Sequence, residues 1–288
     1  MRIRNDWGRA KAVAMLAAAI LLAGCEGSVT IDLASSAPAD PAIDQVLVNL
    51  NGVQFRGGGS SSLEFEDTET IDLNAYGTEV FRMFTEEEID ESTYTGVRLL
   101  FDTDSLEENR VILLDGTEID LVIGDIEFSD VRFEVDEDAS NQETIALTLD
   151  LRQSLRFDDD NDVYVLTPVM RAIRAEDAAA ISGGIFAGCR AGTTLAEGGA
   201  VYLFLGEDVT PDDLDIAGAE PYLTTFAGLD PATGGQGYSF PFVPEGDFTL
   251  ALTCRGNEDD PLFNDELDFV SQGNLSVEAG DTAILDLN

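Results

Sequence analysis

Apolar and polar residues alternate along most of the chain beyond residue 25, which is the pattern of strands that bury one face. Segments with this two-residue period recur at short intervals. In the first part of the chain they cover residues 29–33, 46–50, 97–101, 111–114, 119–123, 131–135, 145–151 and 163–173. Between two of these segments, Asp115-Gly116 predicts a hairpin turn, because glycine tolerates positive φ. The chain is therefore predicted to be mainly β.

Two local features depart from this simple alternation. In residues 78–89, Val80, Phe81 and Phe84 recur at helical spacing, which predicts a helix. Pro168 lies within the 163–173 segment and predicts an edge strand or a bulge there, because proline cannot donate a hydrogen bond to a neighbouring strand.

The amino-acid composition changes near residue 180, which predicts a domain boundary. Ser182-Gly183-Gly184 follows an alanine-rich stretch, and glycine and proline are more frequent beyond it. Later strand segments cover residues 200–205, 222–227, 248–254 and 283–287, and a sandwich of about 100 residues accommodates them. The predicted fold class is all-β, with two consecutive antiparallel β-sandwich domains at residues 25–180 and 181–288.

Residues 1–24 predict a bacterial lipoprotein signal peptide. A basic start precedes an apolar run at residues 12–24, which is shorter than the roughly 20 residues of a membrane-spanning helix. The run ends in Leu22-Ala23-Gly24-Cys25, which resembles the lipobox that directs acylation of its cysteine by chains such as palmitate. Cys25 would begin the mature protein and hold it to the membrane through its acyl chains. Because Glu26 follows, and not the aspartate that resembles an inner-membrane retention signal, we expect a lipid anchor in the outer membrane of a bacterial envelope.

The composition is strongly acidic, with 57 Asp and Glu residues against 15 Lys and Arg residues and a net charge of -42. Removal of residues 1–24 takes away four basic residues and one acidic residue, which makes the net charge -45. Such a surface has no basic region to neutralise phosphates, which excludes nucleic acid as a partner. The chain also lacks histidine, which removes histidine-based catalysis and histidine-ligated metals.

Two cysteines remain after Cys25, and they predict a disulfide. Cys189 and Cys254 form an even pair in an oxidising compartment. Each ends a segment of alternating apolar residues, so both sulfurs would face one core. Two buried free thiols are the alternative, and a reactive thiol is disfavoured because few cations are available to lower its pKa.

The densest acidic cluster is a candidate calcium site. Asp158, Asp160 and Asp162 place carboxylates at alternate positions, and oxygen ligands suit Ca²⁺. The spacing does not fit an EF-hand, because Val163 stands where that loop has its glycine. The favoured alternative is a solvated hairpin tip between a strand that ends at Phe157 and one that begins at Val163. No other metal or cofactor is predicted.

Four arginines of the first domain also bear on binding. Arg98, Arg132 and Arg171 fall inside predicted strand segments, and Arg152 directly continues the strand pattern of residues 145–151. They would either form an anion-binding stripe or, in the favoured interpretation, pair with carboxylates on neighbouring strands. Each exposed pair of that kind contributes about 0.2–1 kcal/mol.

Residues 28–175 resemble the bacterial lipoprotein family described as domain of unknown function 4382. The matching segments occur in the family's order. They are SVTIDLASSAPAD (28–40), QVLVNLNGVQF (45–55), IDLNAY (71–76), STYTGVRLLFD (92–102), LTLDLRQSL (147–155) and YVLTPVMRAI (164–173). Arg152 stands where the family typically has a second aspartate after Asp150. The resemblance implies an envelope lipoprotein without a defined activity.

Residues 181–288 are similar to transthyretin-like sandwiches of the carboxypeptidase-regulatory type. The matching segments are ISGGI (181–185), GGAVYL (198–203), GYSFPFVPEGDFTL (237–250) and VEAGDT (277–282). This resemblance implies a β-sandwich and says nothing of a ligand, because one fold hosts many functions.

No motif of a known catalytic class is present. The chain has no Gly-x-Ser-x-Gly elbow, phosphate loop or dinucleotide-binding glycine pattern. We therefore predict a non-enzymatic lipoprotein of the cell envelope that serves as a binding or adhesion module, with envelope proteins or extracellular glycan as partners. The alternatives are a structural scaffold of the envelope and, less favoured, a hydrolase that uses a pair of carboxylates.

Overall fold

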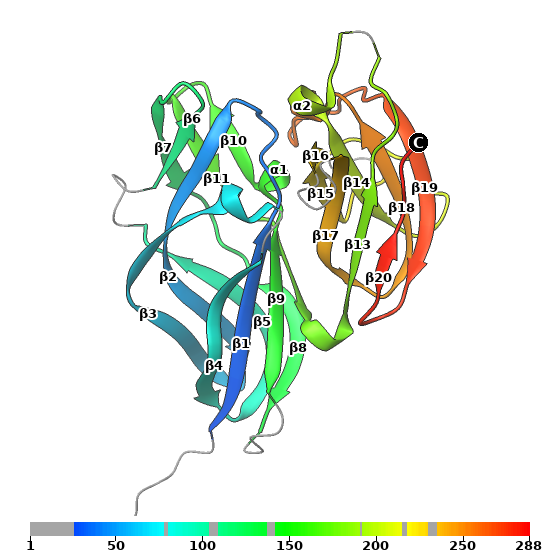
Figure 1. The fold of residues 1–288 in the computed structure, drawn as a ribbon. Helices are drawn as coiled ribbons and strands as arrows, with labels where there is room; N and C mark the ends of the chain where they lie inside the picture. Colours follow the sequence, from blue (N-terminus) through cyan, green and yellow to red (C-terminus); the bar gives the residue numbers. More distant parts are fainter. Residues whose placement is uncertain are drawn as a thin grey trace, which may run out of the picture.

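The structure, a computed structural model, describes residues 26–77, 80–103, 109–136, 142–190, 192–214, 218–229 and 235–288. Within these residues the strands form four sheets, which confirms the predicted all-β class (Figure 1). The predicted signal peptide and the acylation site Cys25 lie outside the described residues. None of the described helical segments has the length and apolar surface that a membrane crossing requires.

Residues 26–174 fold into two sheets that enclose one core. The strands of the smaller sheet, in the order β12-β9-β1-β4, are β1 (Glu26–Ser35), β4 (Phe81–Asp90), β9 (Glu143–Leu149) and β12 (Met170–Arg174). The larger sheet has the order β10-β11-β7-β6-β2-β5-β8, with β3 paired to β2. Its strands are β2 (Ile43–Gly57), β3 (Gly59–Asp72), β5 (Ser92–Phe101), β6 (Arg110–Leu113), β7 (Glu118–Ile123), β8 (Ser129–Val135), β10 (Leu155–Asp158) and β11 (Val163–Leu166).

The alternation of apolar and polar residues in the sequence arises because these two sheets pack against each other. Val29, Ile31 and Leu33 of β1 are fully buried, as are Val46 and Val48 of β2, because alternate side chains point into the space between the sheets. Most strand pairs are antiparallel, as predicted, but β1 pairs with β9 and β11 with β7 in parallel, and in the second half residues 180–182 pair in parallel with residues 282–284.

Residues 178–288 form two further sheets around a second core, beside the first pair (Figure 1). One has the order β16-β17-β13-β20, from β13 (Ala178–Gly184), β16 (Gly228–Leu229), β17 (Gln236–Pro244) and β20 (Thr282–Ile284). The other has the order β15-β14-β18-β19, from β14 (Ala200–Leu205), β15 (Leu223–Phe226), β18 (Gly246–Thr253) and β19 (Phe269–Val277). Among the described residues, no strand of one half pairs with a strand of the other.

The helical segments are short. They are η1 (Leu73–Gly77), α1 (Leu151–Ser154), η2 (Ala175–Asp177), α2 (Leu195–Gly198) and η3 (Gly256–Glu258). The segment η2 connects the two halves, and α1 lies on the side of the first half that faces the second (Figure 1).

The helix predicted over residues 78–89 is wrong, because residues 81–90 form strand β4. Residues 78 and 79 lie outside the described part of the chain. Two irregularities in the pairing of β4 with β1 break the two-residue period, and the second coincides with a positive φ of 53° at Glu86. As a result Met83 and Phe84 are buried in succession, and the apolar residues imitate helical spacing.

Two strand segments also end earlier than predicted. The 163–173 segment divides into β11 and β12, which belong to different sheets, and Pro168 lies in the crossing between them. The 145–151 segment ends at Leu149, and Asp150 caps helix α1 by accepting a hydrogen bond from Gln153 N at 3.2 Å. Arg152 therefore lies in a helix and not in a strand. The hairpin at Asp115-Gly116 is confirmed, with φ of 83° at the glycine.

Candidate functional site

The candidate calcium ligands form the hairpin tip that was the alternative interpretation. Asp158 closes the turn by accepting hydrogen bonds from Asp160 N (3.1 Å) and Asn161 Nδ2 (3.0 Å). The hydrogen bond from Asn161 is the main cause that lowers the pKa of Asp158. The residues from Asp159 to Asp162 are exposed. The structure does not gather the carboxylates of Asp158, Asp160 and Asp162 at ligand distance from one another.

A buried group of carboxylates lies in the second half instead. Carboxylate oxygens of Asp213, Asp259 and Asp265 lie within 4.8 Å of one another, and the first two residues are buried. Three oxygen donors are the ligand type of a hard cation. These carboxylates already accept hydrogen bonds from the Tyr202 hydroxyl, the Leu214 amide (3.1 Å) and the Asp265 amide. The hydrogen bonds give the group a structural role.

Burial raises the pKa of Asp259 to about 6, and burial also raises the pKa of Tyr202 well above its usual value. A carboxyl with a raised pKa beside a second carboxylate is the arrangement expected of an acid–base hydrolase. Here both Asp213 and Asp259 are sealed from solvent, so a substrate does not reach them. This cluster therefore does not provide the accessible pair of carboxylates that a hydrolase would need.

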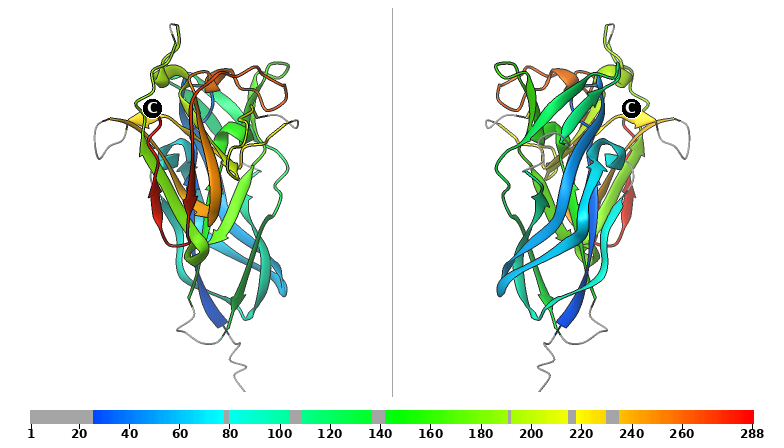
Figure 2. Two further views of the ribbon diagram at one scale, coloured as in Figure 1. Left: turned by 90° about the vertical axis from the view of Figure 1, so that its right-hand side faces the viewer. Right: turned by 90° about the vertical axis from the view of Figure 1, so that its left-hand side faces the viewer.

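Two of these three carboxylates, Asp259 and Asp265, belong to the loop between β18 and β19. We call residues 255–268 of this loop the tip loop. At its centre Leu262 and Phe263 expose 64% and 65% of their surface. Both views in Figure 2 place this loop at the end of the molecule opposite to the start of β1. Two adjacent, large and exposed apolar side chains at the end of a molecule are typical of a contact surface.

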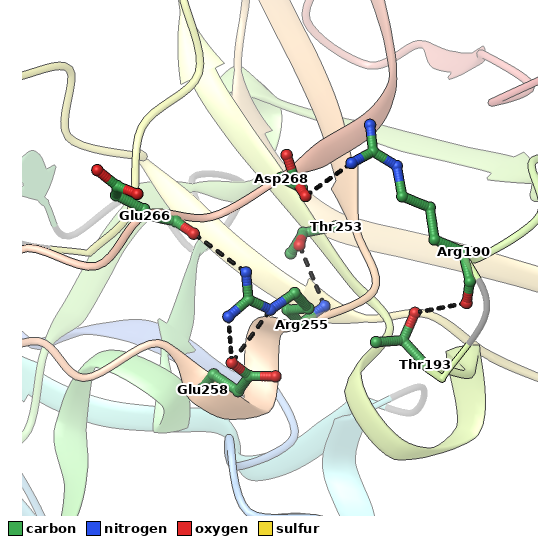
Figure 3. Close-up of polar contacts among 7 residues, drawn as sticks. All are labelled: Arg190, Thr193, Thr253, Arg255, Glu258, Glu266 and Asp268. Atoms are coloured by element: carbon green, nitrogen blue, oxygen red, sulfur yellow. Dashed lines mark hydrogen bonds and ion pairs between the residues drawn. The ribbon is translucent and has the colours of Figure 1, made fainter.

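Three restraints hold the base of the tip loop. The Cys189–Cys254 disulfide, with Cα atoms 5.8 Å apart, closes a loop across the start of the segment. Each of these cysteines precedes one of the two arginines of residues 181–288. Arg190 pairs with Asp268 at 2.9 Å (Figure 3).

Arg255 supplies the third restraint. It pairs with Glu258 at 2.5 Å and donates to the carbonyl of Glu266 at 3.3 Å (Figure 3). Its hydrogen bond is the main cause that lowers the pKa of Glu258. Exposed ion pairs of this kind contribute at most about 1 kcal/mol each. The disulfide is consequently the strongest of the three restraints, at about 4 kcal/mol in the chain-entropy model.

A pocket of about 430 Å³ lies in the first half, where β3 bulges away from β2. It is lined by Asn51, Glu64, Phe65, Glu66, Thr68, Leu100 and Phe101. The volume falls within the range of about 300–1,000 Å³ that is typical of small-molecule sites. We call it the bulge pocket.

The two halves meet through buried polar groups, a role that the sequence did not predict for these residues. Asp150 is 1% exposed and accepts hydrogen bonds from Thr224 N (2.7 Å) and Thr224 Oγ1 (2.8 Å) of the second half. Arg152 is 2% exposed and donates from Nη1 to the carbonyl of Gly256 in η3. Arg171 lies over the ring of Tyr222 at 4.9 Å.

These contacts revise the prediction for the arginines. Because Arg152 is buried, it cannot belong to an anion-binding stripe on the surface. Arg171 contacts the second half of the chain. Arg98 donates to Gln54 at 2.7 Å and lies over Phe128 at 4.6 Å, while Arg132 is exposed.

A family model for the domain of unknown function 4382 (DUF4382) matches residues 26–168. This segment belongs to the DUF4382 family. The match agrees with the resemblance found in the sequence. The DUF4382 segment contains the bulge pocket and helix α1, whereas the tip loop lies outside it.

No curated protein matches the chain. Among solved structures, similarity is found to the Bacillus anthracis TIE protein, at 8% identity and a TM-score of 0.21, covering 91% of this chain and 34% of that one. The chain thus spans about a third of the length of the TIE protein. A candidate adhesin from Bacteroides ovatus has 11% identity and a TM-score of 0.21, with coverage of 90% and 87%. A candidate polysaccharide-binding protein (DUF1812) from Bacteroides thetaiotaomicron has 10% identity and a TM-score of 0.18, with coverage of 87% and 98%.

Proposed function

We propose that this protein is a non-enzymatic lipoprotein of the bacterial envelope that binds a partner protein through its tip loop. The observation that carries the proposal is the pair of exposed side chains, Leu262 and Phe263, on a loop that is restrained at its base. An apolar loop that is held in place loses little conformational entropy when it binds, which favours affinity.

The proposed anchor and the tip loop lie at opposite ends of the molecule, as an anchored binding protein requires. Strand β1 begins at Glu26, directly after the predicted acylated Cys25, and the tip loop lies at the opposite end (Figure 2). Acyl chains on Cys25 would hold the start of β1 at the outer membrane. The tip loop then points away from the bilayer, where a partner can reach it.

The charge around the loop defines the chemistry of the partner. Six acidic residues accompany Leu262 and Phe263 in the tip loop. They are Glu258, Asp259, Asp260, Asp265, Glu266 and Asp268. Asp259 is buried and two others pair with Arg190 and Arg255, so the remaining acids leave the loop surface net negative. A complementary partner has an apolar pocket with basic residues at its rim, because charges of one sign at a rim attract the other sign and repel their own. An anionic lipid or a polyanion does not meet this requirement.

Site-specific crosslinking in the producing cells tests this function. A photoreactive phenylalanine analogue at Phe263 should form an adduct with one discrete protein. The matched control carries the same analogue at Ile284 in β20, which is 74% exposed but outside the tip loop, and should not form that adduct. With the purified partner, Leu262→Ser and Phe263→Ser should each weaken binding about tenfold or more, the effect of losing roughly 1.4 kcal/mol.

Several outcomes contradict the proposal. It fails if position 263 yields no protein adduct, or yields the same adducts as position 284. An adduct with a second copy of this chain would favour the envelope scaffold instead. Affinity for the purified partner that is insensitive to both serine variants would also exclude the tip loop as the binding surface.

The anchor has a test of its own. Cells fed a radiolabelled fatty acid should label the wild-type protein, and Cys25→Ser should abolish the label and release the protein from the membrane fraction. Labelling that survives the substitution would refute acylation at this cysteine.

A further inference from the structure

We propose that the bulge pocket of the DUF4382 segment binds a neutral saccharide unit of a glycan. The inference is independent of the tip loop, which lies in the other half. It rests on how the pocket is built, on the side chains that line it and on its charge.

The pocket exists because the pairing of β2 and β3 skips several residues of β3. Leu50 pairs with Glu69 and Gly52 pairs with Glu64, so the four residues 65–68 lie opposite Asn51 alone. Bulges of this kind redirect side chains and are frequent next to functional sites. Asn51 is itself unpaired in the register with β5, where Leu50 pairs with Phe101 and Gly52 with Leu100.

The backbone at the bulge accepts only glycine. Gly52 has φ of 148°, and a Cβ atom there would lie 1.9 Å from the carbonyl oxygen of Leu63. The close approach of β3 therefore depends on this residue. Two contacts then fix the bulged segment: Phe65 stacks on Phe84 with ring centroids 4.7 Å apart, and Thr68 Oγ1 donates to Asn51 Oδ1 at 2.7 Å.

The accessible lining is mainly polar, with a smaller apolar part. Phe65, Leu100 and Phe101 supply apolar surface, and Glu64 and Glu66 bring carboxylates that accept hydrogen bonds. A pyranose ring has the matching character, with a C–H face that packs on an aromatic ring and hydroxyl groups around its edge that donate to carboxylates.

Charge and size narrow the ligand class further. The two carboxylates repel uronic acids, sialic acids and phosphate groups. A lone ammonium or metal ion would leave most of the 430 Å³ unfilled. A neutral hexose or N-acylhexosamine unit meets both conditions.

Binding of the mature protein to an array of neutral, amino and acidic oligosaccharides, followed by calorimetric titration of the best neutral oligosaccharide, tests the proposal. The Glu64→Ala/Glu66→Ala double variant should bind at least about tenfold more weakly, because it loses the charge-assisted hydrogen bonds that these two carboxylates accept. We call Glu64 and Glu66 the rim of the pocket. Glu69→Ala is the matched control, because Glu69 is an exposed acid of the same strand outside the pocket, and it should bind like the wild type. Leu262→Ser in the tip loop should also leave saccharide binding unchanged.

Phe65→Ala removes one of the two aromatic side chains that line the pocket and should weaken binding. Because Phe65 stacks on Phe84, thermal unfolding of this variant must show that it is folded, and the rim variants give the same answer without altering that stack. The proposal is overturned if no neutral oligosaccharide binds, if acidic oligosaccharides bind best, or if the rim double variant binds as tightly as Glu69→Ala.

Discussion

The hydrogen bonds of Asp150 allow a direct test of how firmly the two halves of the protein are joined. Asp150 is buried between them and serves both: it caps α1 through Gln153 N (3.2 Å) and accepts from Thr224 N (2.7 Å) across the contact. Ser36 Oγ (3.2 Å) completes its surroundings. Asp150→Ala removes the acceptor and leaves these buried donors without a partner.

The expected loss of stability follows from the donors that are stranded. A buried donor without an acceptor costs about 1–3 kcal/mol, and loss of a helix N-cap costs about 1 kcal/mol. With the Thr224 amide, the Thr224 hydroxyl and the cap all affected, the sum is about 3–7 kcal/mol. Thr224→Val removes only the cross-contact hydroxyl and should cost about 1 kcal/mol.

Urea unfolding followed by fluorescence and circular dichroism measures these changes. In the wild type both halves should unfold in one transition, because the contact between them is buried. In Asp150→Ala the midpoint should fall and the transition should broaden or divide, as the halves begin to unfold separately. A double-mutant cycle of Asp150→Ala with Thr224→Val should give a coupling energy of about 1 kcal/mol, since the two changes remove one shared interaction.

Asp158→Ala is the matched control. Asp158 also accepts backbone and side-chain hydrogen bonds, but it does so at an exposed hairpin tip within the first half, and its removal should cost well under the value for Asp150. Equal losses for the two alanine variants, or a coupling energy near zero between Asp150 and Thr224, would refute the role of Asp150 as a link between the halves.

Four further expectations follow from other features. Reduction of the Cys189–Cys254 disulfide, or Cys254→Ser, should lower the free energy of unfolding by up to about 4 kcal/mol in calorimetry, and two free thiols in the non-reduced mature protein would contradict the bond. The carboxyl of Asp259 has a pKa of about 6 in the folded chain and an ordinary value of 3.8, so the folded state holds its proton more tightly and stability should fall as pH rises from 4 to 6. The wild-type curve should fall over this range by ~2–3 kcal/mol relative to that of Asp259→Asn, and parallel curves would contradict the shift. Calcium and magnesium should raise the melting temperature equally, through general screening, because Asp158, Asp160 and Asp162 are not gathered at ligand distance, and a distinctly larger effect of calcium would contradict this. Added salt should stabilise the protein from low ionic strength, since it screens a net charge of -42 in the full chain, and a flat response would leave the acidity unexplained.

Alternation along the sequence was sufficient to predict the fold class, because a sandwich buries one face of each strand. Val29, Ile31 and Leu33 show this directly, since they alternate in the sequence and are all fully buried in the structure. The prediction failed at β4, where pairing with β1 requires bulges. A bulge depends on the partner strand, and the partner of β4 precedes it by about fifty residues.

The sequence predicted less about the candidate site than about the fold class. The acidic run at residues 158–162 suggested a cation site because it places carboxylates at alternate positions, yet a turn uses the first of them for its own hydrogen bonds. Asp213, Asp259 and Asp265 are far apart in the sequence and meet only in the fold. Arg152 carried one signal, an arginine where the DUF4382 pattern typically has an acid, but only the structure shows that it meets the backbone of η3.

The placement of these contacts connects the proposed anchor to the proposed binding surface. Gly256, which accepts from Arg152, opens η3 at the base of the tip loop, and Cys254 lies two residues before it. The tip loop is therefore joined to the first half in two ways, by the covalent chain through η2 and by the hydrogen bond from Arg152 to Gly256 in η3. The covalent chain at η2 carries tension whether or not the halves touch, so what the buried contact adds is a fixed orientation of one half relative to the other. Under the proposed function, the buried polar groups between the halves hold the tip loop in a fixed direction relative to the anchor.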